Sequence, residues 1–81
     1  MTEAEIRTHI FRGLELIAPE ADFDELPSGE NLREELDIDS YDFLSFLIWL
    51  NEDLGVEIPE IDYEKLITLE NLVAYLSQRL N

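Results

Sequence analysis

The sequence has no cysteine, a single histidine and five basic residues among its 81 positions. The lack of cysteine excludes disulfides, thiolate metal sites and cysteine nucleophiles, and it fits a reducing compartment, so we expect a cytoplasmic protein. No run of residues is long and apolar enough to cross a membrane. The first ten residues also lack the basic and then apolar pattern of a signal peptide.

Positive charge is scarce, because twenty acidic residues outweigh the five basic ones and give a formal charge of −15. Nucleic acids and anionic membranes both require a basic footprint, so we expect neither as a partner. A protein with a basic patch, met by electrostatic steering, is the partner that this charge favours. No Lys or Arg lies between Arg33 and Lys65, so the negative field is strongest in the middle of the chain.

What the sequence does contain is enough apolar material for a core, since hydrophobic residues make up 46% of it. This fraction is too high for a disordered acidic tail. The length corresponds to one small domain, which we place at residues 1–81.

The first segment reads as an amphipathic helix over residues 3–18. Thr2 with Glu5 three residues later is a capping-box signature, and Pro19 ends the helix. One helical stripe follows from the apolar spacing of Ile6, Ile10, Phe11, Leu14 and Ile17. Residues 19–39 then form a long connection, which is unusual in a small domain and often functional.

A second helix is predicted from Ser40 to Leu54, with Asp39 as its N-cap and Gly55 as its C-cap. Its apolar residues form two lines rather than one. The core line consists of Phe43, Phe46, Leu47, Leu50 and Leu54, and the other of Tyr41, Leu44 and Ile48. The second line belongs either to the core, if the long connection folds over it, or to a surface that meets another molecule.

The last third begins with an extended linker, Val56–Pro59, and about one or two helical turns over residues 62–66. Thr68 then caps a final helix with a clean stripe from Leu69 to Leu80. No segment alternates as a strand. We therefore predict an all-α fold, a small bundle of three main helices plus a short fourth, with a long loop between helices one and two.

The pair Asp39-Ser40 is the most informative local feature. A serine directly after an acidic N-cap presents its hydroxyl to solvent at a helix N-terminus, where free N–H groups and the helix dipole favour phosphate. The plain alternative is an ordinary helix-start serine, because serine is common there. Ser28 reads as a turn residue and Ser45 lies inside a helix without a preceding aspartate, so both are weaker candidates.

Three segments in order, Leu36–Asp42, Leu54–Pro59 and Leu66–Leu69, carry a family resemblance. Together with the apolar helix between the first two, they closely resemble an acyl carrier protein from about Leu32 to Leu80. The Asp-Ser pair alone is weak evidence. It is strengthened by the Gly-Val-Glu-Ile-Pro linker at the right distance and by the acidic stretch without Lys or Arg between Arg33 and Lys65.

The resemblance implies that Ser40 is the attachment point of 4′-phosphopantetheine, transferred from coenzyme A by a phosphopantetheinyl transferase. It implies that the arm carries acyl groups as thioesters and that Asp39 lies beside the phosphodiester. The chain would then be a monomeric carrier and not an enzyme. Its partners would be acyl-loading and acyl-processing enzymes with basic patches. They would be recognised by apolar Tyr41, Leu44 and Ile48 and by acidic Asp42, Glu52, Asp53 and Glu57.

The chain departs from the family pattern Gly-x-Asp-Ser-Leu at two positions, since Asp37 replaces the glycine and Tyr41 the leucine. Asp37 adds charge and removes a permissive backbone position. Trp49 also stands where a small residue is usual. These differences favour a specialised carrier that serves a dedicated pathway.

The acidic residues allow two other interpretations. The spacing of Asp37 and Asp39 starts like a calcium-binding loop, but Asp42 stands where such a loop needs glycine, so we expect no specific metal site. The charge also permits a small acidic interaction module, or a nucleic-acid mimic that binds a basic partner. That class explains neither the Asp-Ser helix start nor the linker.

Overall fold

The computed structural model describes residues 1–80, and its regular structure is entirely helical over that range. The three long helices are α1, Glu3–Ile17, α3, Ser40–Leu54, and α4, Leu69–Leu80. Shorter elements connect them: the 3-10 helix η1, Phe23–Glu25, the α-helix α2, Leu32–Leu36, and the 3-10 helix η2, Glu60–Leu66. The predicted all-α bundle is confirmed. No helix in residues 1–80 combines the length and apolarity that crossing a bilayer requires.

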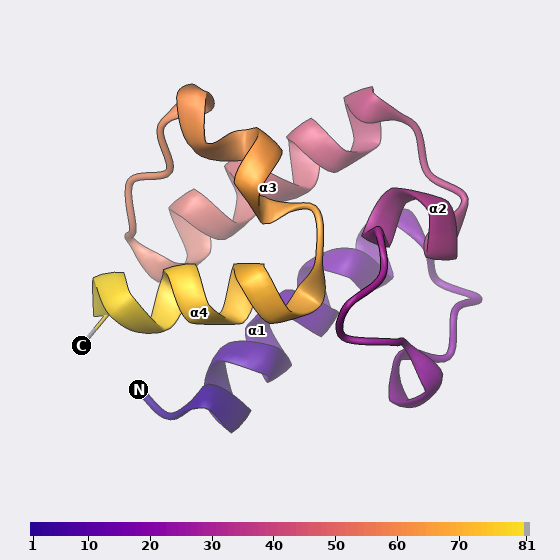
Figure 1. The fold of residues 1–81 in the computed structure, drawn as a ribbon, viewed down its shortest axis with the longest axis horizontal. Coiled ribbons are helices and arrows are strands. Elements are labelled where there is room, and N and C mark those ends of the chain that lie inside the picture. Colours follow the sequence, from indigo (N-terminus) through magenta and orange to yellow (C-terminus); the bar gives the residue numbers. More distant parts are fainter. Residues whose placement is uncertain (81) are drawn as a thin grey trace.

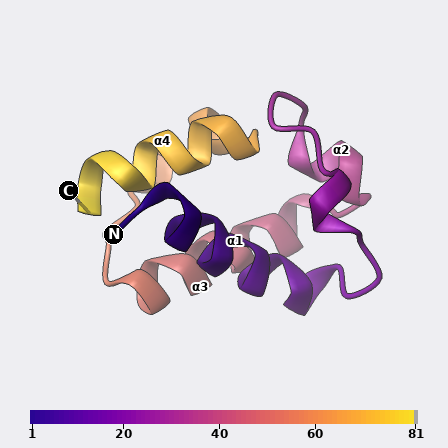
Figure 2. The ribbon, with the colours of Figure 1, turned by 90° about the horizontal axis from the view of Figure 1, so that it is seen from below.

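The three long helices surround one core, with α1 in contact with both α3 and α4 (Figures 1 and 2). The short η2 packs against α4. The start of α1 and the end of α4 lie near each other, whereas α2 lies at the opposite end of the bundle, beside the start of α3 (Figure 1).

The helix boundaries follow the capping residues that the sequence predicts. Thr2 and Glu5 form the complete capping box, and α1 ends at Ile17, one residue before the predicted end. Helix α3 has the predicted bounds, and its C-cap is Gly55, whose φ of 64° is the left-handed conformation that favours glycine. The side chain of Thr68 accepts the N–H of Asn71 and so caps α4.

The core is built from the predicted helical stripes. Each long helix buries residues three and four positions apart, which places them on its inner face. The fully buried side chains are Ile6, Ile10, Leu14, Leu32, Phe46, Leu47, Leu50, Leu66, Leu69, Leu72 and Leu76. Leu32 is the contribution of α2, so the long connection is fixed to the core through this residue.

The connection between α1 and α3 is ordered by hydrogen bonds with the start of α4 and the residue Ile67 that precedes it. The N–H of Leu32 donates to the carbonyl of Ile67 at 2.7 Å, and the N–H of Glu70 donates to the carbonyl of Ser28 at 2.9 Å. The side chain of Asn31 caps α2 by accepting the N–H groups of Arg33 and Glu34. These bonds hold α2 in place beside the start of α3.

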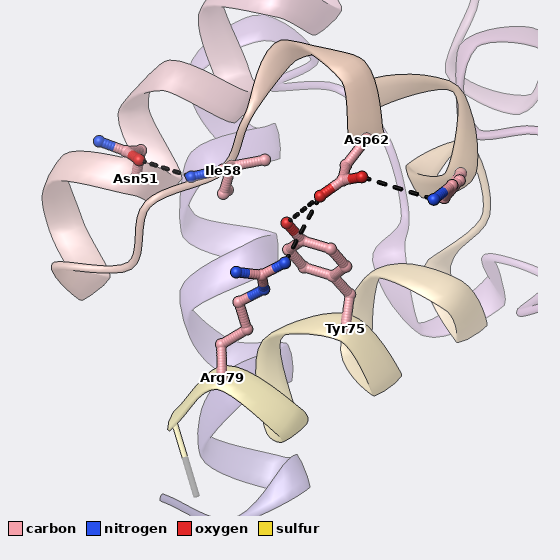
Figure 3. Close-up of polar contacts among 6 residues, drawn as sticks. Asn51, Ile58, Asp62, Tyr75 and Arg79 are labelled. Carbon is pink, nitrogen blue, oxygen red and sulfur yellow. Dashed lines mark hydrogen bonds and ion pairs between the residues drawn. The ribbon is translucent and has the colours of Figure 1, made fainter.

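Hydrogen bonds hold the linker against α3 and η2 against α4 (Figure 3). Asn51 of α3 accepts the N–H of Ile58 at 2.9 Å. The hydroxyl of Tyr75, on α4, donates to Asp62 of η2 at 2.7 Å, and the Arg79 guanidinium lies 3.5 Å from the same carboxylate oxygen (Figure 3). Helix η2 begins at Glu60, two residues earlier than predicted, directly after Pro59, whose fixed φ suits a helix start.

Candidate functional site

Ser40 is the first residue of α3, and its side chain is exposed. Asp39 acts as the N-cap: its carboxylate accepts the N–H of Asp42 at 2.8 Å, and its carbonyl accepts that of Phe43 at 3.1 Å. Within residues 1–80 the Ser40 hydroxyl has no hydrogen-bond partner. Asp39 therefore does the capping, and the Ser40 hydroxyl is left available for covalent chemistry.

The backbone at this end of α3 suits an esterified phosphate. The N–H groups of Ser40 and Tyr41 come before the first intrahelical donor, so α-helix geometry leaves them without an acceptor inside the helix. The dipole of a 15-residue helix adds partial positive charge at the same end. An exposed hydroxyl without a partner, next to two amides, thus fits a phosphodiester on the Ser40 oxygen.

The segment that leads into Ser40 contains a left-handed turn at Asp37. Its φ is 53°, and it is the one non-glycine residue with positive φ in residues 1–80. The turn closes α2, because the N–H of Ile38 donates to the carbonyl of Arg33 at 3.0 Å. Aspartate is among the few residues that tolerate this conformation, so the fold keeps the turn where the family pattern has glycine.

The second apolar line of α3 is exposed. The exposed fractions are 74% for Tyr41, 37% for Leu44 and 47% for Ile48. The long connection therefore does not cover this line, and of the two alternatives that the sequence leaves open, the structure has the surface one. Three apolar side chains at helical spacing make a contiguous patch that another molecule could bury.

The acidic residues predicted beside this patch do not all lie together. At about 100° per residue, Glu52 continues the line of Ile48 along α3, whereas Asp42 and Asp53 lie about a third of a turn or more round the helix from Ile48. The Asp53 side chain already has a partner within the protein, because its carboxylate lies 2.6 Å from Nδ1 of His9 on α1. Glu57 is exposed on the linker.

A mainly apolar groove of about 270 Å³ opens beside Ser40, between α3 and η2. It is lined by Arg33, Ser40, Phe43, Leu44, Leu47, Glu60, Tyr63, Glu64 and Ile67. The groove was not foreseen from the sequence. Helical periodicity does not show that the 3-10 helix η2 lies beside Ser40. The many carboxylates after residue 33 also draw attention away from Arg33, which is the one cation among the residues that line the groove.

The η2 wall of this groove is held by the Tyr75–Asp62 contact. The Tyr75 hydroxyl donates to the carboxylate and, as the largest cause, lowers the pKa of Asp62 below its ordinary value. The pKa of Tyr75 is raised, mainly by its partial burial and secondly by its hydrogen bond to Asp62. The guanidinium of Arg79 also lies over the Tyr75 ring, 4.4 Å from its centre.

In the part of the chain that the structure describes, no three His, Asp or Glu side chains are grouped so that they could hold a metal ion.

The family of this chain is shown by its similarity to known proteins. The chain matches the family described as phosphopantetheine attachment site over residues 12–76. The acyl carrier protein of Lactobacillus acidophilus is 36% identical over 78 residues, which is 94% of this chain and 94% of the relative. The acyl carrier protein of Campylobacter jejuni subsp. jejuni is 38% identical over 55 residues, or 68% of this chain and 71% of the relative.

A match over most of the chain, with relatives at this identity, shows the family. The cofactor of this family is covalently attached 4′-phosphopantetheine, and the role is that of an acyl carrier. The chain belongs to the acyl carrier proteins that contain a phosphopantetheine attachment site.

Proposed function

We propose that Ser40 is the residue that carries the phosphopantetheine arm. The observation that supports this most is the state of its hydroxyl, which is exposed, has no partner within residues 1–80 and stands at the start of a 15-residue helix. Asp39 caps the helix, so esterification of Ser40 would cost α3 no capping bond. The Ser40 oxygen would form a P–O bond to the pantetheine-bearing phosphorus of coenzyme A as the pyrophosphate bond breaks. Adenosine 3′,5′-bisphosphate would leave, and the hydroxyl proton would pass to the transferase.

In this proposal the chain supplies the attachment point and the surface, and other enzymes supply the catalysis. The thiol of the bound arm provides the thioester on which an acyl cargo travels. The chain would work as a monomeric single domain, 1–81, in the cytoplasm. Its high negative charge supports brief, steered encounters with basic enzymes, which suit a carrier that must leave each enzyme after delivery.

The surface proposed for these encounters is the exposed line of Tyr41, Leu44 and Ile48, with Glu52 at its end and Glu57 nearby on the linker. Apolar side chains would be buried at the centre and carboxylates would meet basic residues at the rim. Asp42 and Asp53 lie to one side of this line, so we assign them a smaller share of the contact. A tyrosine beside Ser40 supports a specialised carrier whose enzymes accept a bulky residue there.

The attachment site is tested by intact-mass spectrometry after incubation with coenzyme A and a promiscuous phosphopantetheinyl transferase. We expect wild type and Ser45→Ala to gain one phosphopantetheine and Ser40→Ala to gain none. Ser45 is a matched control, because it is an exposed serine on the same helix. A gain of mass by Ser40→Ala would place the arm on another residue.

The partner surface is tested through the rate of the same transfer at low salt. Glu52→Gln should lower kcat/KM about 2- to 5-fold through slower association, and salt should shrink the difference. Glu15→Gln on α1 removes the same charge from an exposed position away from the patch and should leave the rate unchanged. Equal effects of the two variants would show that only net charge matters.

A further inference from the structure

Arg33 is the only positively charged residue between Arg12 and Lys65 in the sequence. Its side chain is exposed, and within residues 1–80 its guanidinium forms no ion pair or hydrogen bond. The other two cations of the second half are engaged, since Lys65 and Arg79 both pair with Asp62. An arginine without a partner in an acidic region is therefore the exception in this part of the molecule.

The backbone of Arg33 is held firmly. Its N–H donates to the side chain of Asn31 at 2.9 Å, and its carbonyl accepts the N–H of Ile38 at 3.0 Å. Its neighbour Leu32 is fully buried. The position of Arg33 is thus fixed by the core and by both ends of α2, and only the side chain is free to move.

Arg33 and Ser40 line the same groove. The other charged residues of that groove, Glu60 and Glu64, come from η2 and are negative. Asp39 and Asp42 add further carboxylates next to Ser40 in the chain. A phosphodiester on Ser40 would therefore enter a strongly negative surrounding, in which Arg33 is the one cation lining the same space.

We propose that Arg33 is a positioning residue that pairs with the phosphodiester on Ser40 and so orients the base of the arm along the groove. This proposal rests on the attachment at Ser40. Guanidinium suits the task, because its planar fork of N–H donors matches two phosphate oxygens at once. The pair also offsets the repulsion between the new phosphate and the carboxylates around it.

A purely local role for Arg33 is the alternative. There its charge would only moderate the repulsion among nearby carboxylates such as Glu34 and Glu35, whether or not an arm is present. The two roles differ in one respect that can be measured: only the pairing role makes the environment of the phosphorus depend on Arg33.

The test is 31P NMR of the phosphopantetheine-loaded protein as salt is raised from low concentration to about 1 M, where screening is strong. The wild-type phosphorus resonance should move with salt toward the position found for Arg33→Gln, which should itself move little. Arg33→Lys should give an intermediate shift. Arg12→Gln removes a charge from α1 and should match wild type. Superimposable wild-type and Arg33→Gln titrations would overturn the proposal.

A second measurement needs no variant. In wild type, the Nε–Hε resonance of Arg33 should shift when the arm is attached, while that of Arg12 stays in place. An unchanged Arg33 resonance would refute the pairing. Intact mass, recorded on the same samples, separates the two proposals. A protein without the arm counts against Ser40, and a protein loaded on Ser40 without these shifts counts against Arg33 alone.

Discussion

The indole ring of Trp49 occupies the space that a side chain on Gly13 would fill. A Cβ atom built on Gly13 would lie 2.7 Å and 2.8 Å from two carbons of that ring, and 3.0 Å from the Phe46 ring. Helices α1 and α3 thus pack a large aromatic side chain against a bare backbone. This explains how the fold accepts a tryptophan where the family pattern has a small residue.

Gly13→Ala should destabilise the protein although alanine is the better helix former. Overpacking against Trp49 costs about 1–3 kcal/mol and the higher helix propensity of alanine offsets about 1 kcal/mol, so we expect the free energy of unfolding in urea to fall by up to about 2 kcal/mol. Adding Trp49→Leu should cost less in the Gly13→Ala background than in wild type, as a double-mutant cycle would show. An increase in stability for Gly13→Ala alone would contradict the close packing.

Tyr75→Phe should lower Tm by about 3–6 °C at neutral pH, because it removes the hydrogen bond to Asp62 but keeps the ring beneath Arg79. Tyr63→Phe is the matched control. It deletes a tyrosine hydroxyl on the groove side of η2 that donates no hydrogen bond within residues 1–80. Equal losses in the two variants would argue that the Tyr75–Asp62 bond contributes nothing of its own.

The difference between wild type and Tyr75→Phe should also depend on pH. The pKa of Asp62 is lowered by the Tyr75 bond, so this stabilisation is complete above the ordinary value of 3.8 and disappears as pH falls through the lower folded value. The pKa of Tyr75 is raised, so the loss at alkaline pH begins only above the ordinary value of 10.0. Thermal unfolding should give a constant difference from about pH 5 to 9. A difference that grew toward acid would have the wrong sign.

Asp37 provides a test of backbone conformation that is independent of charge. Asp37→Gly should raise stability by about 0.5–1 kcal/mol, because glycine adopts positive φ without a Cβ penalty. Asp37→Ala should lower it by about 1 kcal/mol, since alanine lacks the local hydrogen bonding that helps aspartate there. Both variants remove one negative charge. If both were stabilising by the same amount in urea unfolding, charge and not φ would govern this site.

The sequence was sufficient for the elements that follow a simple period and have strong caps. Asp39 and Gly55 bound α3, and the stripe from Leu69 to Leu80 predicts α4. The 3-10 helices η1 and η2 are poorly predicted from the sequence, because they lack the 3.6-residue period of an α-helix. Nothing in the sequence predicts η1, and the predicted start of η2 lies two residues after the observed start.

The candidate site was predictable where it depends on one helix and not where it depends on several. Ser40 and the line of Tyr41 and Ile48 follow from the pattern of α3 together with the family resemblance. The groove requires η2 to be placed against α3, which only the tertiary structure supplies. Likewise, the pairing of Asp53 with His9 joins residues 44 positions apart, beyond the reach of any local pattern.

Attachment of the arm to Ser40 is tested most directly by locating the modification in the wild-type protein. The protein would be loaded with coenzyme A and a phosphopantetheinyl transferase and then digested, and its peptides would be fragmented in a mass spectrometer. We expect a single phosphopantetheine, on the peptide that contains Asp39-Ser40-Tyr41, with fragment ions that assign it to Ser40. A modification on Ser28 or Ser45, or a fully loaded protein with an unmodified Ser40, would contradict it.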